Sequence, residues 1–462
     1  MYHDDLSERS SQVARATSRP SPSPGALLVQ YARTMCTNQR VYACTRSKDP
    51  MTLRSVTFLI ALALLAAACS TDAPEAGAPS SAPTAAPAST TTAPSTAAPS
   101  RSTGSTIGFD EWTAFRGGPE RRGFDGNPEG NDEPDLQWQS PTGGVVESSP
   151  AVVNGLVIGG TFDNALFALD ASTGEEVWRF EVGGLLRSSP AVVDGVAYFG
   201  ADDNLFYAVN IEDGSEVWRF SLGGGGQQSS PAVVDGVVYF GAFDNFVYAL
   251  DAATGEQIWR FETGAGILSS PLVLNGLLSI GSIDGIFYTL DANTGEEIWR
   301  FNALGPIFSS AAILPPIDED TPAAVVFGAD DGVIRALGAA DGEVRWGIRT
   351  TAPVFATPTV ADGIVYVGSR DGGFLAIDGA DGTILWATDL TEVLSSAAVT
   401  DERIYVGSSD GNLHVLDRTT GQSLHRLPVG ELVWTSPVVV DDHLFFGAHD
   451  GNIHAYRLTR PI

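Results

Sequence analysis

The stretch SSPAVVDGVVYFGAFDNFVYALDAATGEQIWRFET, residues 229–263, decides the fold of this chain. It contains four short runs in which apolar residues alternate with other positions. Turn signals separate these runs at Asp235-Gly236, Asp244-Asn245 and Thr254-Gly255. An apolar period of two is typical of β-strands, and Asp, Asn and Gly favour tight chain reversals. The stretch therefore predicts a four-stranded antiparallel meander.

The same unit, about 40 residues long, recurs along the chain. The hydroxyl residue that begins its first strand is found eight times, at Ser149, Ser189, Ser230, Ser270, Ser310, Thr357, Ser396 and Ser436. The turn between its second and third strands also recurs eight times, with Asp163, Asp203, Asp244, Asp284, Asp331, Asp371, Asp410 and Asp450. Repeats that stack side by side bury their faces best in a closed ring. The sequence predicts an all-β, eight-bladed β-propeller of four-stranded antiparallel blades over residues 135–462.

A tryptophan marks the fourth strand of most units, and one more precedes the first unit. These residues are Trp138, Trp178, Trp218, Trp259, Trp299, Trp346 and Trp386. The seventh unit has His425 at this position, and the eighth unit has no fourth strand of its own. Because an open ring would leave unpaired strand edges, we expect the N-terminal strand around Trp138 to complete the last blade. We interpret the tryptophans as structural, since a large flat ring can be buried between neighbouring blades.

The segments before the repeats have the composition of a targeting signal and a linker. Residues 51–68 contain a basic residue, an apolar run and then small residues, the order of a secretory signal peptide. We expect translation to begin at Met51, with Met35 as an alternative start and residues 1–50 as an upstream extension. Residues 69–105 are mostly Ala, Pro, Ser and Thr and predict a disordered tether, and residues 106–134 form a lead-in.

Cys69 follows three small residues and resembles the acylated cysteine of bacterial lipoproteins. The resemblance implies lipidation at Cys69, and the alternative is an ordinary secretory signal. The protein is then exported and lipid-anchored to a bacterial envelope membrane, facing the periplasm or the exterior. The anchor is the only membrane contact that we expect.

The charge of the chain restricts its partners. There are 56 acidic against 26 basic residues, and the formal net charge is −30. This sign opposes nucleic-acid phosphates and favours cationic partners. The sequence therefore predicts protein partners, no nucleic acid, and a monomer.

The link between the third and fourth strands reads ALDASTG at residues 168–174, four residues before Trp178. This resembles the tryptophan-docking repeat of the PQQ-like (pyrroloquinoline-quinone) propeller superfamily, over about residues 106–462. A lipid-anchored member would be similar to BamB-like outer-membrane assembly propellers. The resemblance then implies a non-enzymatic scaffold that docks other proteins.

The enzymes of the superfamily provide the alternative. They are expected to hold PQQ and calcium beneath a disulfide between adjacent cysteines, and this chain has no cysteine in its repeats. We therefore expect no cofactor and no catalytic residues, and keep a PQQ-dependent dehydrogenase or PQQ sensor as the second hypothesis.

Two features of the sequence suggest metal binding, but each has a simpler structural interpretation. Five of the six histidines lie in the last two units, and His414 and His454 take the third-strand position that Tyr248 and Tyr288 hold elsewhere. No pair has a zinc-motif spacing, so we interpret them as substituted strand residues and expect no metal. The acidic insertion at residues 315–321 is better explained as a solvated loop than as a calcium loop.

The residues just before each first strand should line the mouth of the central channel. They are Glu147, Arg187, Gln228, Leu268, Phe308, Phe355, Leu394 and Trp434. One arc is polar and the other apolar, which makes this mouth the candidate binding site. The alternative is that these side chains fold over one another and plug the channel. Phe355 and Trp434 also permit a third hypothesis, binding of cell-wall carbohydrate.

Overall fold

The computed structural model describes residues 113–117, 133–316 and 322–458. The chain divides into residues 1–105 and 106–462, and the description concerns the second unit. The predicted signal peptide, Cys69, the tether and the acidic part of the 315–321 insertion lie outside the described residues. Within the described ranges, no helix is long and apolar enough to cross a membrane.

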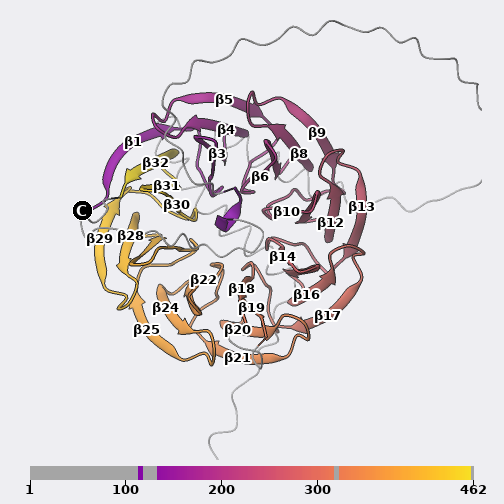
Figure 1. Ribbon diagram of the computed structural model, residues 1–462, viewed down its shortest axis with the longest axis vertical. Coiled ribbons are helices and arrows are strands. Elements are labelled where there is room, and N and C mark those ends of the chain that lie inside the picture. The colour runs from indigo at the N-terminus through magenta and orange to yellow at the C-terminus, as the bar shows by residue number, and fades with distance from the viewer. Residues whose placement is uncertain (1–112, 118–132, 317–321, 459–462) are drawn as a thin grey trace, which may run out of the picture. The chain divides into compact units, whose positions relative to one another are not determined.

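Eight four-stranded antiparallel sheets stand around a common axis, as blades of a propeller (Figure 1). The first four blades consist of β2 (Ala151–Val153), β3 (Leu156–Thr161), β4 (Ala165–Asp170) and β5 (Glu176–Glu181); β6 (Ala191–Val193), β7 (Val196–Gly200), β8 (Leu205–Asn210) and β9 (Glu216–Ser221); β10 (Ala232–Val234), β11 (Val237–Gly241), β12 (Phe246–Asp251) and β13 (Gln257–Glu262); and β14 (Leu272–Leu274), β15 (Leu277–Gly281), β16 (Ile286–Asp291) and β17 (Glu297–Asn302).

The next three blades consist of β18 (Ala312–Leu314), β19 (Ala324–Gly328), β20 (Val333–Gly338) and β21 (Val344–Arg349); β22 (Thr359–Ala361), β23 (Ile364–Gly368), β24 (Gly373–Asp378) and β25 (Ile384–Asp389); and β26 (Ala398–Val399), β27 (Arg403–Gly407), β28 (Asn412–Asp417) and β29 (Ser423–Pro428). In every blade the first strand lies nearest the axis and the fourth lies outermost (Figure 1).

The eighth blade is completed by the N-terminal strand, as predicted. Its strands are β30 (Val438–Val440), β31 (His443–Gly447), β32 (Asn452–Arg457) and β1 (Asp135–Pro141). β1 pairs antiparallel with β32, and Trp138 lies opposite Ala455. The last four-stranded sheet is therefore built from both ends of the propeller domain.

Local turn chemistry explains the hairpins. Asp235 and Gly236, between β10 and β11, both have positive φ, of 49° and 76°. Two successive left-handed residues form the turn whose twist matches an antiparallel hairpin, and Asp-Gly is a preferred pair there. At the next turn, the left-handed position is held by Asn245 in this blade and by Gly285 in the following one. The alternation of Asn and Gly along the repeats thus follows from one backbone requirement.

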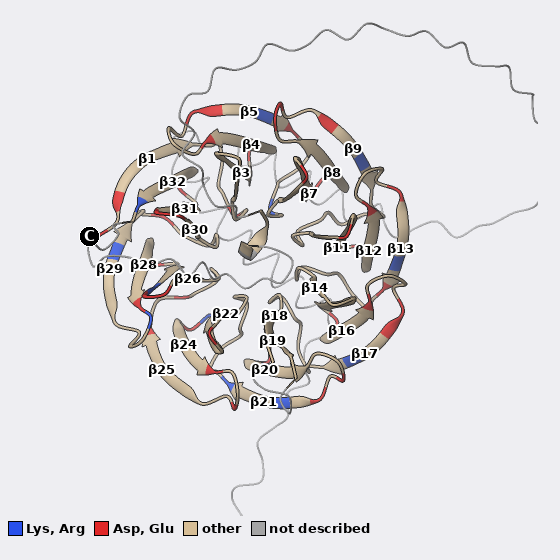
Figure 2. Ribbon diagram, viewed as in Figure 1, with Lys and Arg blue, Asp and Glu red and all other residues tan. Residues whose placement is uncertain are grey.

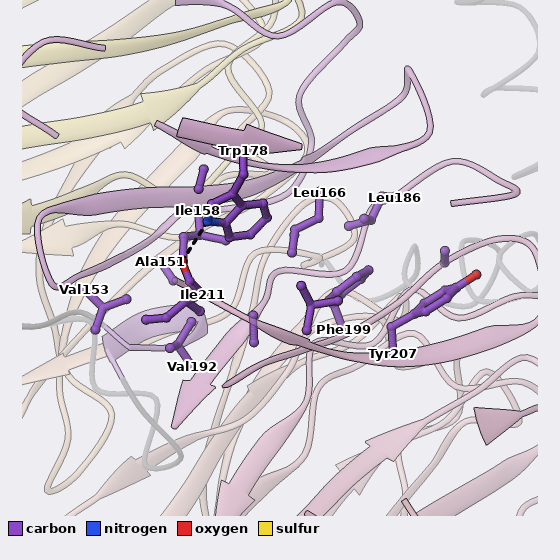
Figure 3. Close-up of a cluster of buried hydrophobic side chains, with 14 residues drawn as sticks. Ala151, Val153, Ile158, Leu166, Trp178, Leu186, Val192, Phe199, Tyr207 and Ile211 are labelled. Atoms are coloured by element: carbon purple, nitrogen blue, oxygen red, sulfur yellow. Dashed lines mark hydrogen bonds between the residues drawn. The ribbon is translucent and has the colours of Figure 1, made fainter. Parts of the chain in front are cut away.

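The hydrophobic core lies between blades. In the interface between the first two blades, Ile158 and Leu166 from one sheet meet Phe199 and Val209 from the next (Figure 3). A buried cluster of this kind occupies each of the eight interfaces. Each blade is therefore stabilised by its two neighbours more than by an interior of its own.

Each of the seven repeat tryptophans docks on the following blade. The indole N–H of Trp178 donates to the carbonyl oxygen of Ile211 at 2.7 Å (Figure 3), and the other six make the same bond at 2.8–3.1 Å. The ring lies over a glycine of the receiving blade. A Cβ placed on that glycine, for example Gly214, would come within 2.4–3.0 Å of the indole across the seven sites. The tryptophans have the structural role that the sequence indicated.

Hydroxyl groups link the inner strands around the axis. The backbone N–H of the residue that begins one blade donates to the side-chain oxygen of its counterpart in the next, at 2.8–3.2 Å. The bond from Ser436 to Ser149 joins the eighth blade to the first. Because these groups are buried, the bonds satisfy donors that no strand partner reaches.

The contact between glycine and tryptophan gives a direct stability prediction. Gly255 and Gly236 have nearly the same left-handed φ, 73° and 76°, but only Gly255 faces an indole, that of Trp218, whereas a Cβ on Gly236 would meet nothing within 4 Å. Gly236→Ala should cost about 1 kcal/mol through backbone strain alone. Gly255→Ala should cost about 2–4 kcal/mol, because steric overlap is added. Urea unfolding of both variants measures the difference, and equal losses would contradict the docking interpretation.

Candidate binding face at the mouth of the propeller

Each mouth residue is positioned by a buried neighbour. The loop that enters a blade places one side chain against a glycine at the end of the preceding blade's second strand, as Leu186 does on Gly160. A Cβ on these eight glycines would lie 1.9–2.3 Å from the incoming loop. Seven of the eight side chains are Val, Leu or Ile, and the third blade has Gln227. Since no larger residue fits in place of the glycine, the next residue of the loop is held at the axis.

The eight predicted mouth residues occupy equivalent positions, and all of them are half-buried, whereas the residues on both sides of each are buried. A second set of residues surrounds them, each lying just before a turn aspartate. These second-ring residues are Phe162, Asp202, Phe243, Ile283, Asp330, Arg370, Ser409 and His449. Their backbone N–H groups all donate to carbonyl oxygens of the entering loops, for example Asp202 to Leu185 at 2.9 Å. Both rings therefore belong to one face.

The polar arc of the mouth is an interlocked charge cluster. Arg187 Nε lies 3.4 Å from Glu147 Oε2, and its Nη1 pairs with Asp202. The guanidinium also lies over the Phe162 ring, 4.7 Å from its centroid. Burial raises the pKa of Asp202, although Arg187 and Gln228 oppose this. Two carboxylates thus share one arginine.

The apolar arc holds aromatic side chains together with a second charge cluster. The rings of Phe308 and Phe355 are 4.7 Å apart, and the Arg370 guanidinium lies 5.1 Å from the Phe355 centroid. Arg370 Nε also bonds Glu392 at 2.8 Å. The face of Phe355 is therefore covered by a cation of the protein itself, which weakens the carbohydrate hypothesis because sugars stack on open rings.

Trp434 is fixed at the boundary between the two arcs. Its indole N–H donates to Ser409 at 2.9 Å, and its ring meets His449 edge-on with centroids 4.6 Å apart. His449 Nε2 lies 3.3 Å from Glu147 Oε1. This chain of contacts joins the apolar arc to the polar arc.

The eight turn aspartates form a collar outside these rings. Asp244 is typical, because it accepts hydrogen bonds from the Tyr248 hydroxyl at 2.7 Å and from the Gly223 N–H at 2.8 Å. Burial and the adjacent Asp244 raise the pKa of Tyr248, so its hydroxyl stays protonated and neutral. Among the described ion pairs, Arg335 is the single arginine that reaches a collar carboxylate, that of Asp331. The carboxylates of Asp203, Asp244 and Asp284 accept from tyrosine hydroxyls, which orient them without neutralising them.

His414 and His454 replace the tyrosines of this arrangement, as the sequence indicated. Each places Nε2 3.0 Å from the collar carboxylate four residues earlier, Asp410 and Asp450 respectively. Burial lowers the pKa of His414 more than Asp410 raises it. Within the described residues no group of three or more His, Cys, Asp or Glu is arranged to hold a metal ion.

Residues 113–117 of the lead-in lie inside the ring. The 3-10 helix η1 (Phe115–Gly117) appears as the indigo coil at the centre of Figure 1. Just before it, the carbonyl oxygen of Thr113 accepts a hydrogen bond from Val192 N–H of the inner strand β6, and Ala114 is buried beside Ala191 and Val233. The channel is thus occupied by the chain itself at the level of the inner strands. This second ring and this filling segment were not identified from the repeats, although the position before each turn aspartate offered a signal for the former.

Comparison with known proteins agrees with this architecture. Residues 131–364 match the family model described as "Beta-alanine-activating enzyme, beta-propeller". Residues 284–461 match the model described as "Outer membrane protein assembly factor BamB". No curated protein sequence matches the chain significantly.

Solved structures share the fold at low sequence identity. BamB from Moraxella catarrhalis is 17% identical with a TM-score of 0.62, and the match covers 70% of this chain and 100% of that one. Quinohemoprotein alcohol dehydrogenase from Comamonas testosteroni is 14% identical with a TM-score of 0.67, covering 76% and 81%. The computationally designed Ika8 protein is 21% identical with a TM-score of 0.59, covering 70% and 100%. One fold is thus shared with an assembly factor, an enzyme and a design.

The histidine substitution gives a pH-dependent prediction. The folded-state pKa of His414 lies below its ordinary value of 6.5, so unfolding takes up a proton as the pH falls through 6.5 towards the folded-state pKa. The stabilising contribution is complete above pH 6.5 and is lost within that window. His414→Tyr, which restores the residue found at Tyr248, should therefore raise Tm relative to wild type increasingly as the pH is lowered from about 7.5 to about 5.

The reciprocal variant Tyr288→His serves as the control. Tyr288 bonds Asp284 at 2.7 Å in the same way, and a histidine there should acquire the acid sensitivity that the first variant removes. Thermal denaturation across this pH range measures both effects. A Tm difference between His414→Tyr and wild type that is independent of pH would contradict the assignment.

Proposed function

Since the chain belongs to the PQQ-like β-propeller family described as "Beta-alanine-activating enzyme, beta-propeller", we propose that it is a non-enzymatic scaffold that binds another protein over its mouth face. We further propose that it acts outside the cytoplasm, anchored through Cys69. The BamB-like fold supports a role in protein interaction. The observation that carries the proposal is the mouth itself, where aromatic and charged side chains are held half-exposed by a rigid ring.

The composition of this face is that of a recognition surface. Aromatic residues and arginine are enriched where proteins bind one another, and Phe162, Phe308, Phe355 and Trp434 lie here with Arg187. Seven of the eight loops are anchored by aliphatic side chains in glycine pockets, so binding requires little ordering of the backbone.

A PQQ-dependent activity is the second candidate, favoured by the likeness to quinohemoprotein alcohol dehydrogenase. The donor set at the mouth does not suit the cofactor and its calcium. A calcium ion takes about six to eight oxygen ligands, and the carboxylates here lie beside guanidinium groups, Glu147 and Asp202 beside Arg187 and Glu392 beside Arg370. The repeats also contain no cysteine for a disulfide cover. We therefore derive no chemical step through the quinone.

Partner capture tests the proposal. Phe308→Asp combined with Trp434→Asp should reduce recovery of specific partners from the native envelope about tenfold or more, because both changes bury a charge in the contact. The matched control is Val177→Asp combined with Ile298→Asp, at outer-strand positions that are 48% and 46% exposed. The control should leave recovery unchanged. Circular dichroism and Tm establish that each variant is folded.

Equal recovery by wild type and the mouth variant, with both folded, would contradict binding at the mouth. In parallel, equilibrium dialysis with PQQ and calcium separates the two candidates. The scaffold proposal expects no binding at tens of micromolar quinone, roughly the KM range of ordinary enzyme substrates. Stoichiometric uptake followed by alcohol- or sugar-dependent dye reduction would replace the proposal with the enzyme.

A further inference from the structure

The mouth carries the same charge arrangement twice. Arg187 lies over Phe162 and between the carboxylates of Glu147 and Asp202. We name these four residues the first pole. Arg370 lies over Phe355 and pairs with Glu392, and its charge opposes the rise that burial causes in the pKa of Asp330. We name these four residues the second pole. Each pole contains two carboxylates and one arginine.

Each pole therefore has one more carboxylate than it has arginines. Burial raises the pKa of Asp202 in the first pole and of Asp330 in the second, and in each case the arginine counteracts the rise. A half-buried carboxylate with an incomplete share of positive charge gains from a further cation. The collar adds to this, because the carboxylates of Asp203, Asp244 and Asp284 accept from neutral tyrosine hydroxyls.

One buried group at the first pole is also left without a hydrogen bond. The His449 side chain is 7% exposed, and its Nε2 lies 3.3 Å from Glu147 without hydrogen-bond geometry in the described structure. Its ring is held against Trp434. The first pole thus presents an unused polar nitrogen beside an indole and an under-compensated pair of carboxylates.

Apolar mouth residues accompany the two poles. Leu268, Phe308 and Leu394 belong to the same inner ring as Glu147 and Arg187, and all are half-buried. Figure 2 shows arginines recurring on the outer strands β5, β9, β13, β17 and β21, away from the mouth. The two rings of the mouth contain the arginines Arg187 and Arg370.

We propose that the mouth recognises a polypeptide segment in which basic side chains flank apolar ones. One Lys or Arg head enters the first pole beside Glu147 and Asp202, its alkyl stem lies on Trp434, and a second enters beside Glu392 and Asp330. The apolar residues between them lie on Leu268, Phe308 and Leu394. This inference rests on the proposed function and specifies the chemistry of its partner.

Capped synthetic peptides test the proposal. The probes are acetylated and amidated peptides with two lysines separated by one, three or five Leu or Phe residues, and matched peptides with norleucine in place of either lysine or both. At the best spacing, each lysine should improve affinity for the wild-type protein about five- to tenfold at low salt, as expected for charge pairs between exposed and buried. Isothermal titration measures the dissociation constants.

Two pole variants and one control locate the effect. Glu147→Gln and Glu392→Gln should each abolish the advantage of one lysine while retaining affinity for the norleucine peptide. Each removes a single charge and leaves Arg187 paired with Asp202, or Arg370 beside Asp330, which protects folding. Glu212→Gln removes the same charge from an exposed position on the opposite face and should change nothing. Trp434→Leu, which keeps the charge, should weaken the lysine and norleucine peptides alike.

The possible results distinguish failure of the charge proposal from failure of the proposed function. If norleucine peptides bind as tightly as lysine peptides at every spacing, and mouth variants weaken both, the mouth binds protein. The proposal that the two poles recognise basic side chains is then wrong. If Glu212→Gln lowers affinity as much as the pole variants, a general attraction replaces the poles. If no peptide binds and partner recovery is also unaffected by the mouth variant, the proposed function fails as well.

Discussion

The docking of a tryptophan on the glycine of the next blade is the contact on which the rest of this structure depends. A blade exposes two apolar faces and has no interior of its own, so its stability must come from its neighbours. The indole covers apolar surface, while its N–H satisfies a carbonyl oxygen at the end of the neighbour's third strand. Burial contributes about 2–3 kcal/mol and the hydrogen bond about 1 kcal/mol at each site. Repeated seven times, this contact ties the outer strand of one blade to the blade that follows it.

Because other residues hold the ring together, the mouth residues are free to differ from blade to blade. Outer strands and inner hydroxyls hold the ring, and buried aliphatic side chains fix the loops in glycine pockets. The residue that follows each buried side chain is a mouth residue, and the eight mouth residues share no contact that the fold requires of all of them. That freedom explains how Glu147, Leu268 and Trp434 occupy equivalent positions. Differences among the eight loops therefore carry information about a partner, whereas their similarities carry information about the fold.

Periodicity determined how much was predictable from sequence. The blades, the closure through Trp138 and the tyrosine-like position of His414 all follow from local patterns repeated in register, and the structure confirms them. The mouth residues were placed on one face by counting chain reversals. The pairing of Arg187 with Glu147 and Asp202 was not predictable, because it joins residues from different blades through side-chain geometry. The position of Thr113 beside β6 belongs to a segment without repeats, so no internal comparison was available for it.

The hydroxyl links around the axis run in one rotational sense. Seven such bonds each run from one blade to the blade after it, and the bond from Ser436 returns to Ser149. Such a circuit has no privileged starting point, and the backbone dipoles along it are related by rotation and largely cancel. At the seam, β1 pairs with β32 as the fourth strand pairs with the third in the other blades, although β1 and β32 lie at opposite ends of the propeller sequence. The inner strands are therefore linked at the seam by the same bond that links them elsewhere in the ring.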